Sequence, residues 1–310
     1  MGKHGSMSYQ VTEALKGIFT PGVSRHALKQ CDLANRRIVG ISTMRNYVSD
    51  GTTFAQWCKR EYGIQRIGDI TPAMAEEYTQ GMRDCELSGG YIGRVECAIR
   101  KLDVAMRKRK WRGRDAEPLL PAQRDSPHSD RRPERAYTPE QADKLIDDMR
   151  ERAKDKQVVD VVQLQQVAGL RVSEAAMIRG EDIDAERCVI QVVDGTKGGR
   201  SREVQVGLEH REFLVKLREK AGGRRDGRVF CNRGDRGSAL AKRVRSAVKC
   251  ACERMSVPNY GTHGFRKCYA QDKHKELLTK GGGDRNARQA VARELGHNRV
   301  DVTYSYVSRL

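Results

Sequence analysis

The chain has 310 residues, which is long enough for two domains of about 150 residues each. Its formal net charge of +18, pI near 9.7 and mean hydropathy of -0.71 favour a polyanionic partner, nucleic acid first, over a solvated basic surface without a partner. No apolar run approaches the ~20 residues that cross a bilayer, and the N-terminus lacks the apolar core of a signal peptide, so we expect a cytoplasmic, nucleoid-associated protein without membrane contact.

The first third of the chain predicts a small bundle of helices. After an N-terminal segment, residues 1–30, Ser42 can cap one helix, and a second run around Phe54 places apolar side chains on one face. Thr71 followed by Pro72 is a strong helix start. A further helix is indicated by apolar residues at steps of three and four: Ile92, Val95, Ile99, Leu102 and Met106. Residues 31–117 therefore form the first predicted domain.

A basic cluster, "RKRKWRGR" at residues 107–114, follows this last helix. Such a run is usually a solvated helix end, and a phosphate-contacting surface is the functional alternative in a chain of this charge. The candidate DNA contacts of this cluster are Arg107, Lys108, Arg109, Lys110 and Arg112.

Residues 118–135 are rich in proline, charge and serine and predict a linker, which leaves residues 136–310 for a second domain. That domain opens with a capping box formed by Thr138 and Gln141, and its second helix stops at Gly169. Two β-rich runs, "RCVIQVV" and "SREVQV", flank a glycine-rich turn and predict a hairpin. We expect further helices over residues 208–220, 240–255, 263–278 and 286–295.

The cysteines and histidines do not predict a metal site. The nine cysteines include no C-x-x-C pair, and the seven histidines show neither an H-x-x-x-H spacing nor a paired cysteine. We interpret the cysteines as reduced, mostly buried thiols, and we expect no metal ion and no other cofactor.

Four motifs of the second domain place polar residues that suit phosphate chemistry. In "GLRVSE", Arg171 lies between a helix stop and the next helix start, and in "DGTKGGRSREV" flanking glycines expose Lys197 on a tight turn. "THGFR" puts His263 and Arg266 on one helix face. "LGHNRVDVTYSYV" adds His297 and two tyrosines. Taken singly, each motif is a common surface pattern.

In this order the four motifs resemble the tyrosine recombinase (phage integrase) family. The family pattern is an arginine in G-L-R-x-x-E, a hairpin lysine, H-x-x-R, and L-G-H followed nine residues later by a nucleophilic tyrosine. The resemblance covers roughly Tyr137 to the C-terminus, and the N-terminal helices match the family's core-binding domain more loosely. It implies a mainly α fold with a small β-sheet, in which a helical, SAM-like core-binding domain and a mixed α/β catalytic domain form a C-shaped clamp on DNA.

The resemblance also implies a role for each motif residue. Arg171 and Arg266 would clamp the scissile phosphate, and Lys197 would protonate the leaving 5′ oxygen. His263 and His297 would supply hydrogen bonds and proton transfer. The site would be supported by Glu174, and the further DNA contacts expected in this domain are Arg200, Arg202, Lys242 and Arg243.

The implied chemistry is physically consistent with these residue types. Attack on a phosphodiester builds negative charge on the non-bridging oxygens, which guanidinium groups bind bidentately. A tyrosine with a free pKa near ~10 needs a cationic site to react as a phenolate. The two arginines are expected to take the place of a metal ion. The 3′-phosphotyrosine that forms stores the energy of the broken bond, so rejoining is expected to need no ATP.

The two C-terminal tyrosines, Tyr304 and Tyr306, are expected to differ in role. Residues two apart on a helix point about 200° away from one another, so only one can face the phosphate. The family interval of nine residues after His297 selects Tyr306 as the nucleophile. Tyr304 is then expected to pack or to contact DNA, and the alternative is that both are core aromatics.

The leading hypothesis is a site-specific recombinase or integrase that acts as a tetramer on double-stranded DNA. Its last motif looks most like integrases of mobile elements, and accessory DNA-bending or directionality proteins are further expected partners. One alternative is a type IB topoisomerase, which uses a similar site as a monomer. Another is a DNA-binding protein whose site has decayed, against which the intact set of motif residues argues.

Overall fold

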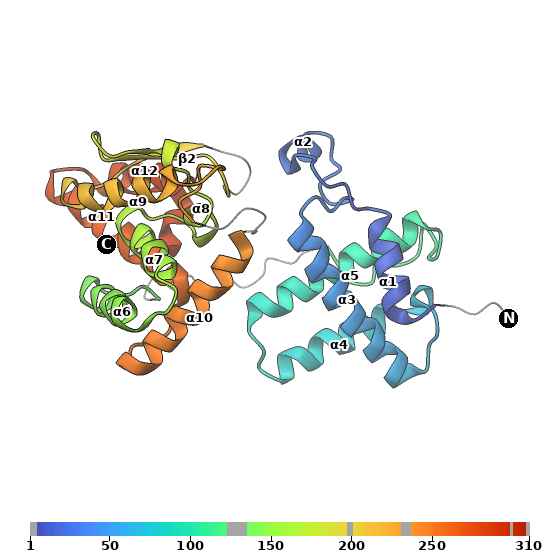
Figure 1. Cartoon of the computed structure of the whole chain (residues 1–310). Coiled ribbons are helices and arrows are strands. Elements are labelled where there is room, and N and C mark those ends of the chain that lie inside the picture. Colours follow the sequence, from blue (N-terminus) through green and yellow to red (C-terminus); the bar gives the residue numbers. More distant parts are fainter. Residues whose placement is uncertain (1–4, 123–134, 197–200, 231–236, 298–299, 308–310) are drawn as a thin grey trace. The chain divides into compact units, whose positions relative to one another are not determined.

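The computed structural model describes residues 5–122, 135–196, 201–230, 237–297 and 300–307 (Figure 1). The chain divides into two compact units, Met1–Asp130 and Arg131–Leu310, and each has its own hydrophobic core. The fold is mainly helical with one small sheet, as expected. Within the described ranges, no helix is long and apolar enough to span a bilayer.

The first unit is a bundle of helices. Its elements are α1 (Met7–Lys16), α2 (Arg25–Gln30), α3 (Ile41–Tyr62), the 3-10 helix η1 (Ile67–Asp69), α4 (Pro72–Asp84) and α5 (Gly89–Lys108). Helix α1 packs against α3 and α5 and buries Val11, Ala14 and Leu15. The first 30 residues, expected as a separate segment, therefore contribute a core helix, which begins where the Ser6 side chain accepts a hydrogen bond from Tyr9 N at 3.2 Å.

Helix α3 is continuous where two shorter runs were expected. It begins after Gly40, so the prediction of Ser42 as its cap was wrong. Glycine weakens an isolated helix, and Gly51 lies in its middle. A Cβ at Gly51 would lie 3.2 Å from Val11 Cγ1 and 3.9 Å from Leu102 Cδ2. The close packing of α1 and α5 at this point explains why the helix continues through the glycine.

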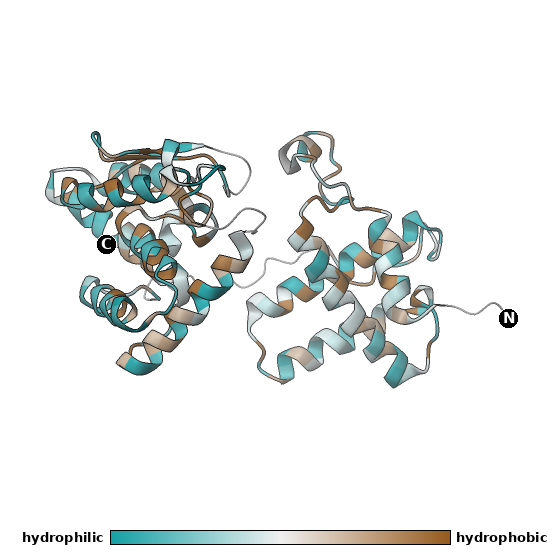
Figure 2. Ribbon diagram, viewed as in Figure 1, coloured by the Kyte–Doolittle hydropathy of each residue, from teal (hydrophilic) through white to brown (hydrophobic). Residues whose placement is uncertain are grey.

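Helices α4 and α5 confirm the sequence signals. The Thr71 side chain accepts a hydrogen bond from Met74 N at 3.3 Å, and Pro72 occupies the first helical position. The apolar residues predicted at steps of three and four along α5 are all buried, and Figure 2 shows the hydrophobic positions interspersed with hydrophilic ones along these helices.

Most of the basic cluster after α5 is bound within the first unit. The Arg112 side chain is only 8% exposed, and its Nε lies 3.2 Å from Asp103 Oδ1. The expectation that Arg112 contacts DNA is therefore corrected, since its guanidinium pairs with an interior carboxylate. Three neighbours also donate to carbonyl groups of this unit: Arg107, Lys108 and Arg109. Lys110 is exposed and stays a predicted DNA contact.

The expected linker begins inside the first unit. Leu119 and Leu120 are buried in its core, although they lie in the polar stretch of residues 118–135. Most of the rest of that stretch, residues 123–134, lies outside the described residues.

The second unit combines helices with one small antiparallel sheet. Its elements are α6 (Pro139–Arg152), α7 (Gln157–Ala168), α8 (Val172–Ala175), η2 (Gly180–Asp182), β1 (Ile183–Asp184), β2 (Val189–Val192), β3 (Arg202–Gln205), η3 (Leu208–His210), α9 (Arg211–Gly222), α10 (Gly237–Met255), α11 (Gly261–Thr279), α12 (Asp284–Glu294) and η4 (Val300–Ser305). The predicted hairpin is confirmed, with Ile190 opposite Val204, and β1 adds a third strand that was not expected.

Helix α11 is the element around which this unit packs. It contacts α7, α10 and α12 and buries Phe265 and Cys268 in the core. The Tyr137 ring lies 4.6 Å from that of Phe265, centroid to centroid, and its hydroxyl accepts a hydrogen bond from Tyr260 N just before α11. Because α11 is enclosed in this way, an arginine on it can reach the interior of the unit.

We expect Gly169→Ala to destabilise the second unit by about 2–4 kcal/mol. Gly169 ends α7 with a φ of 59°, and a Cβ there would lie 2.3 Å from the Tyr269 ring. The free energy of unfolding from urea titration measures the effect. Gly222→Ala is the control, since a Cβ at Gly222 meets nothing within 4 Å. Equal stability of the two variants would contradict the close approach of Gly169 and Tyr269.

Candidate active site

The carboxylate of Glu174 lies at the centre of the site. Arg171 Nη1 donates to its Oε1 at 2.6 Å, and Arg202 donates to its two oxygens at 3.1 and 2.8 Å. Arg266 Nη1 lies 3.5 Å from Oε2. These arginines come from the start of α8, from β3 and from α11, so one carboxylate joins three elements that are distant in sequence.

The charge of Glu174 is fixed by these partners. Burial alone raises the pKa of the carboxyl group, but the ion pair with Arg202, the backbone N–H of Arg171 and the charge of Arg266 outweigh it and lower the pKa to about 2. At neutral pH, one carboxylate thus faces three guanidinium groups, and the cluster has an excess of positive charge.

Arg266 is completely buried. Its terminal nitrogens donate to the carbonyl oxygens of Gly169 and Leu295, whereas Nε finds no acceptor among the described residues. Desolvation lowers the pKa of Arg266 to about 10, which still leaves it protonated at neutral pH. A buried cation with unmet hydrogen-bonding capacity is suited to an anionic ligand.

Arg171 is placed at the site by the boundary between α7 and α8. Gly169 ends α7 in the left-handed conformation, Leu170 is buried, and Arg171 is the N-cap of α8. The backbone N–H of Arg171 donates to Glu174 Oε2 at 2.8 Å. With its side chain 20% exposed, Arg171 lies at the surface of the cluster, where an incoming phosphate can meet it.

Tyr306 faces this cluster. Its hydroxyl oxygen lies 3.4 Å from His297 Nε2, and its ring centroid is 5.9 Å from Arg266 Cζ. The His263 ring packs edge-on against it, with the centroids 5.3 Å apart. The structure thus brings Tyr306 to the place where both histidines and Arg266 meet.

Both histidines are neutral at pH 7. Desolvation, together with the charges of Arg266 and Arg171, lowers the pKa of His297 to about 4. His263 is more exposed, yet desolvation in the crowded site and the charges of Arg266 and Lys267 lower its pKa to about 4 as well. The positive charge of the site therefore belongs to the arginines.

Tyr304 lies apart from this cluster. Its ring is covered by another arginine, with Arg288 Cζ 4.6 Å from the ring centroid. Tyr304 lies in the 3-10 helix η4, and Tyr306 follows the last residue of that helix. Only Tyr306 is directed at Arg266.

The hairpin turn lies against the start of α8. Gly195 has a φ of 72°, and a Cβ there would lie 2.5 Å from the carbonyl oxygen of Ser173. The Ser173 hydroxyl donates to Gly195 O at 3.3 Å. The predicted acid Lys197 and the predicted DNA contact Arg200 lie outside the described residues.

The expectation that Arg202 contacts DNA is corrected, because its guanidinium is bound inside the unit. Its side chain is 8% exposed, and besides Glu174 it donates from Nε to the carbonyl oxygen of Glu294 at 2.6 Å. Arg202 therefore supports the cluster from inside. The "SREV" run itself held no signal for this pairing, because Arg202 lies on an edge strand and Glu174 is distant from it in the sequence.

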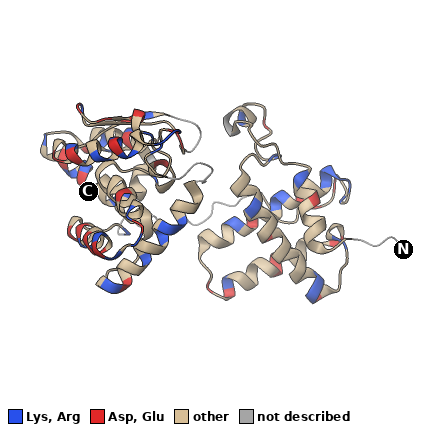
Figure 3. Cartoon of the chain, in the orientation of Figure 1, with Lys and Arg blue, Asp and Glu red and all other residues tan. Residues whose placement is uncertain are grey.

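The two expected contacts on α10, Lys242 and Arg243, are exposed, and Figure 3 shows basic residues along this helix. Arg243 Nε is 2.9 Å from Asp155 Oδ2. These two residues remain predicted DNA contacts.

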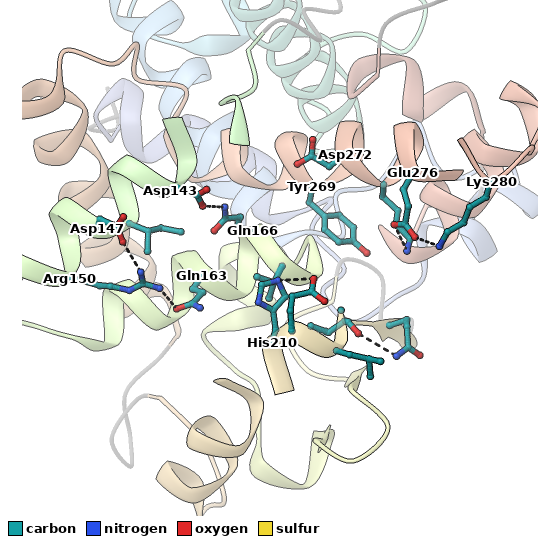
Figure 4. Close-up of a pocket in the computed structure, with 18 residues that line it drawn as sticks. Asp143, Asp147, Arg150, Gln163, Gln166, His210, Tyr269, Asp272, Glu276 and Lys280 are labelled. Carbon is teal, nitrogen blue, oxygen red and sulfur yellow. Dashed lines mark hydrogen bonds and ion pairs between the residues drawn. The ribbon is translucent and has the colours of Figure 1, made fainter. Parts of the chain in front are cut away.

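A cleft of about 940 Å³ opens on the second unit between α6, α7, α11 and the segment around η3 (Figure 4). It is lined by polar side chains, among them Asp143, Gln166, His210, Asp272 and Glu276. Of the candidate residues that the structure describes, none lines this cleft, so it is separate from the arginine cluster.

Two contacts of the tyrosine segment were not predicted. Gln271 Nε2 donates to Tyr306 O at 3.0 Å, and Arg288 Nη1 donates to Val307 O at 3.1 Å. The available signal for the second contact was the spacing of four residues between Asp284 and Arg288, but the predicted helix began at residue 286 and left Asp284 outside it. In the described part of the chain, no three His, Cys, Asp or Glu side chains gather as a metal site would require.

Comparison with known proteins gives concordant matches. A model of the phage integrase family matches residues 135–310. The tyrosine recombinase XerC of Roseiflexus castenholzii is 24% identical over 289 residues, which are 88% of this chain and 85% of that protein.

Solved structures show the same fold. The XerH site-specific recombinase bound to difH substrate has a TM-score of 0.62 at 16% identity, over 93% of this chain and 82% of that chain. The Tn1549 transposon integrase in complex with transposon right end DNA has a TM-score of 0.61 at 16% identity, over 93% and 96% of the two chains.

We expect the ring signals of His263 and His297 to titrate near pH 4 in the folded protein. In the urea-unfolded chain they should titrate near ~6.5. Because the folded pKa is the lower one, the stability that these neutral rings contribute is complete above pH 6.5 and is lost as the pH falls towards 4. NMR titration of the folded protein, with single His→Gln variants for assignment, measures this. Midpoints near 6.5 in the folded state would contradict the desolvated site.

Proposed function

The chain belongs to the phage integrase family of tyrosine recombinases, which cleave and rejoin DNA, and we propose that it recombines specific DNA sites through a 3′-phosphotyrosine formed on Tyr306. The observation that supports this most directly is the position of the Tyr306 hydroxyl, 3.4 Å from His297 Nε2 and next to the buried Arg266 guanidinium, while Tyr304 packs on Arg288.

In the proposed cleavage step, the Tyr306 oxygen attacks the scissile phosphorus. A bond forms between the tyrosine oxygen and phosphorus, and the bond to the 5′ oxygen breaks. Arg171 and Arg266 bind the non-bridging oxygens, whose negative charge grows in the transition state. The cluster has the positive charge for this, since Glu174 neutralises only one of its three guanidinium groups.

Proton transfer balances the step. The 5′ oxygen leaves with a proton, for which we propose Lys197 as donor, and the Tyr306 proton passes towards His297 or water. His297 is neutral at pH 7 and can accept a hydrogen bond from the tyrosine through Nε2 in the tautomer that is protonated on Nδ1. Rejoining is the reverse step, in which a 5′ hydroxyl attacks the phosphotyrosine, so no ATP is consumed.

The exposed basic residues support a role for both units in DNA binding. Lys110 in the first unit and Lys242 and Arg243 in the second lie at the surface. We propose that both units bind duplex DNA and that their affinity falls steeply with salt, as counterion release requires. We further propose that the protein acts as a tetramer on DNA, together with accessory proteins. We also propose a mobile element as its natural context, and the C-terminal motif "LGHNRVDVTYSYV" supports this last proposal.

Recombination is preferred to topoisomerase activity because the matched relatives are named recombinases and integrases. An assay that follows joining of two sites on separate DNA molecules separates the two functions. Relaxation of supercoils without joined products would favour the topoisomerase.

Tyr306→Phe is expected to abolish the covalent protein–DNA adduct on a nicked suicide substrate, because the attacking oxygen is removed. Binding of the same DNA should be unchanged. Tyr304→Phe is the matched control and should form the adduct at the normal rate, since its ring and the contact with Arg288 remain. An adduct that survives the first change and disappears with the second would identify Tyr304 as the nucleophile.

Adduct formation is expected to continue in excess EDTA. The two arginines that we assign to the phosphate take the place that metal ions have in other phosphoryl transfer enzymes. Gel analysis of the adduct with and without EDTA measures this. Complete loss of product on chelation, with recovery on adding Mg²⁺, would refute metal-free cleavage.

A further inference from the structure

A second buried arginine, Arg288 on α12, lies behind the tyrosine segment. It is 1% exposed, and its Nε donates to both carboxylate oxygens of Asp284, at 3.0 and 2.7 Å. Its Nη1 donates to Val307 O at 3.1 Å, and its guanidinium carbon lies 4.6 Å from the Tyr304 ring centroid. One side chain therefore contacts residues on both sides of Tyr306.

Arg288 is itself held in place. Asp284, at the start of α12, also lies 2.9 Å from Nε2 of His274, a buried residue of α11. The chain of contacts runs from His274 through Asp284 to Arg288. Because a buried charge that loses its partner is costly, this arrangement keeps the guanidinium in a single position.

The segment that carries Tyr306 needs such support. Helix η4 has six residues in the 3-10 conformation, which has poorer hydrogen-bond geometry than an α-helix. It ends with Tyr306 N and Val307 N both donating to Thr303 O at 2.9 Å. It packs against α12, and the hydrogen bond from Gln271 to Tyr306 O links its end to α11.

We propose that Arg288, supported by Asp284 and His274, is a positioning residue that holds Tyr306 in line with the scissile phosphate, and that the Tyr304 ring is its second point of contact. The inference rests on the proposed role of Tyr306. A cation over an aromatic face is a specific contact, and a displacement of about 1 Å of a reacting group can cost 10²-fold in rate. Tyr304 thus helps to position Tyr306.

The test is single-turnover adduct formation on a saturating nicked suicide substrate. Arg288→Met should form the adduct about 10- to 100-fold more slowly than the unchanged protein, with the DNA Kd within about twofold. Tyr304→Leu should also be slower, whereas Tyr304→Phe should keep the normal rate. Arg285→Met is the control, because Arg285 is an exposed arginine on the same helix.

The rate and the amplitude of the reaction separate positioning from stability. A variant that is only destabilised gives less adduct at an unchanged rate, and that result would overturn the proposal. A mispositioned tyrosine gives full amplitude at a reduced rate. The reduced rate should persist on a substrate with sulfur at the leaving 5′ position, where the thiolate needs no proton, because Arg288 acts on the attacking group.

The failure of this proposal and the failure of the proposed function give different results. If Tyr306→Phe abolishes the adduct and Arg288→Met reacts normally, the proposal for Arg288 fails while the recombinase mechanism stands. If Arg288→Met does not fold, Tyr304→Leu decides, since its half-buried ring can be lost with less disturbance: a normal rate overturns the proposal. The double variant should be no slower than Arg288→Met alone, since both changes remove the same contact.

Discussion

The ion pairs of Glu174 are the interaction on which the second unit and its site depend. A buried carboxylate is tolerated only when its charge is compensated, and here three guanidinium groups do so from the α8 start, from β3 and from α11. Removing the carboxylate would leave three buried or half-buried cations to repel one another. The same residue therefore holds the hairpin, α8 and α11 together and sets the spacing of the arginines that we assign to the phosphate.

The balance of charge within this cluster supports the proposed binding of a DNA phosphate. One negative charge against three positive ones leaves an excess that an incoming phosphate can neutralise, and burial strengthens that attraction because few water molecules screen it. The histidines do not add to the excess, because the arginines and desolvation keep them neutral. They can exchange hydrogen bonds with Tyr306 as neutral rings, and the positive charge of the cluster is that of its arginines.

Local signals in the sequence predicted the hairpin and several helix ends correctly, because each depends on a few neighbouring side chains. Thr71, Thr138 and Gly169 begin or end helices as expected. The features that were missed depend on distant contacts. Gly51 stays helical because α1 and α5 pack closely against it. Arg112 points into the interior because it pairs with Asp103, and Arg202 does so because it pairs with Glu174. Charge alone does not distinguish an arginine that binds DNA from one that pairs inside.

The two tyrosines show where motif spacing and structure complement each other. A separation of two residues gives the two rings different directions, and the interval of nine residues after His297 favours Tyr306 as the one that faces the site. Each ring contacts a buried guanidinium group. The Tyr306 ring contacts that of Arg266, and the Tyr304 ring contacts that of Arg288. The difference lies in what else those arginines bind. Arg288 is saturated by a carboxylate and a carbonyl oxygen in a closed chain of contacts, whereas Arg266 has an N–H without an acceptor among the described residues. Arg266 therefore keeps hydrogen-bonding capacity beside Tyr306, whereas the guanidinium beside Tyr304 is bound by protein groups.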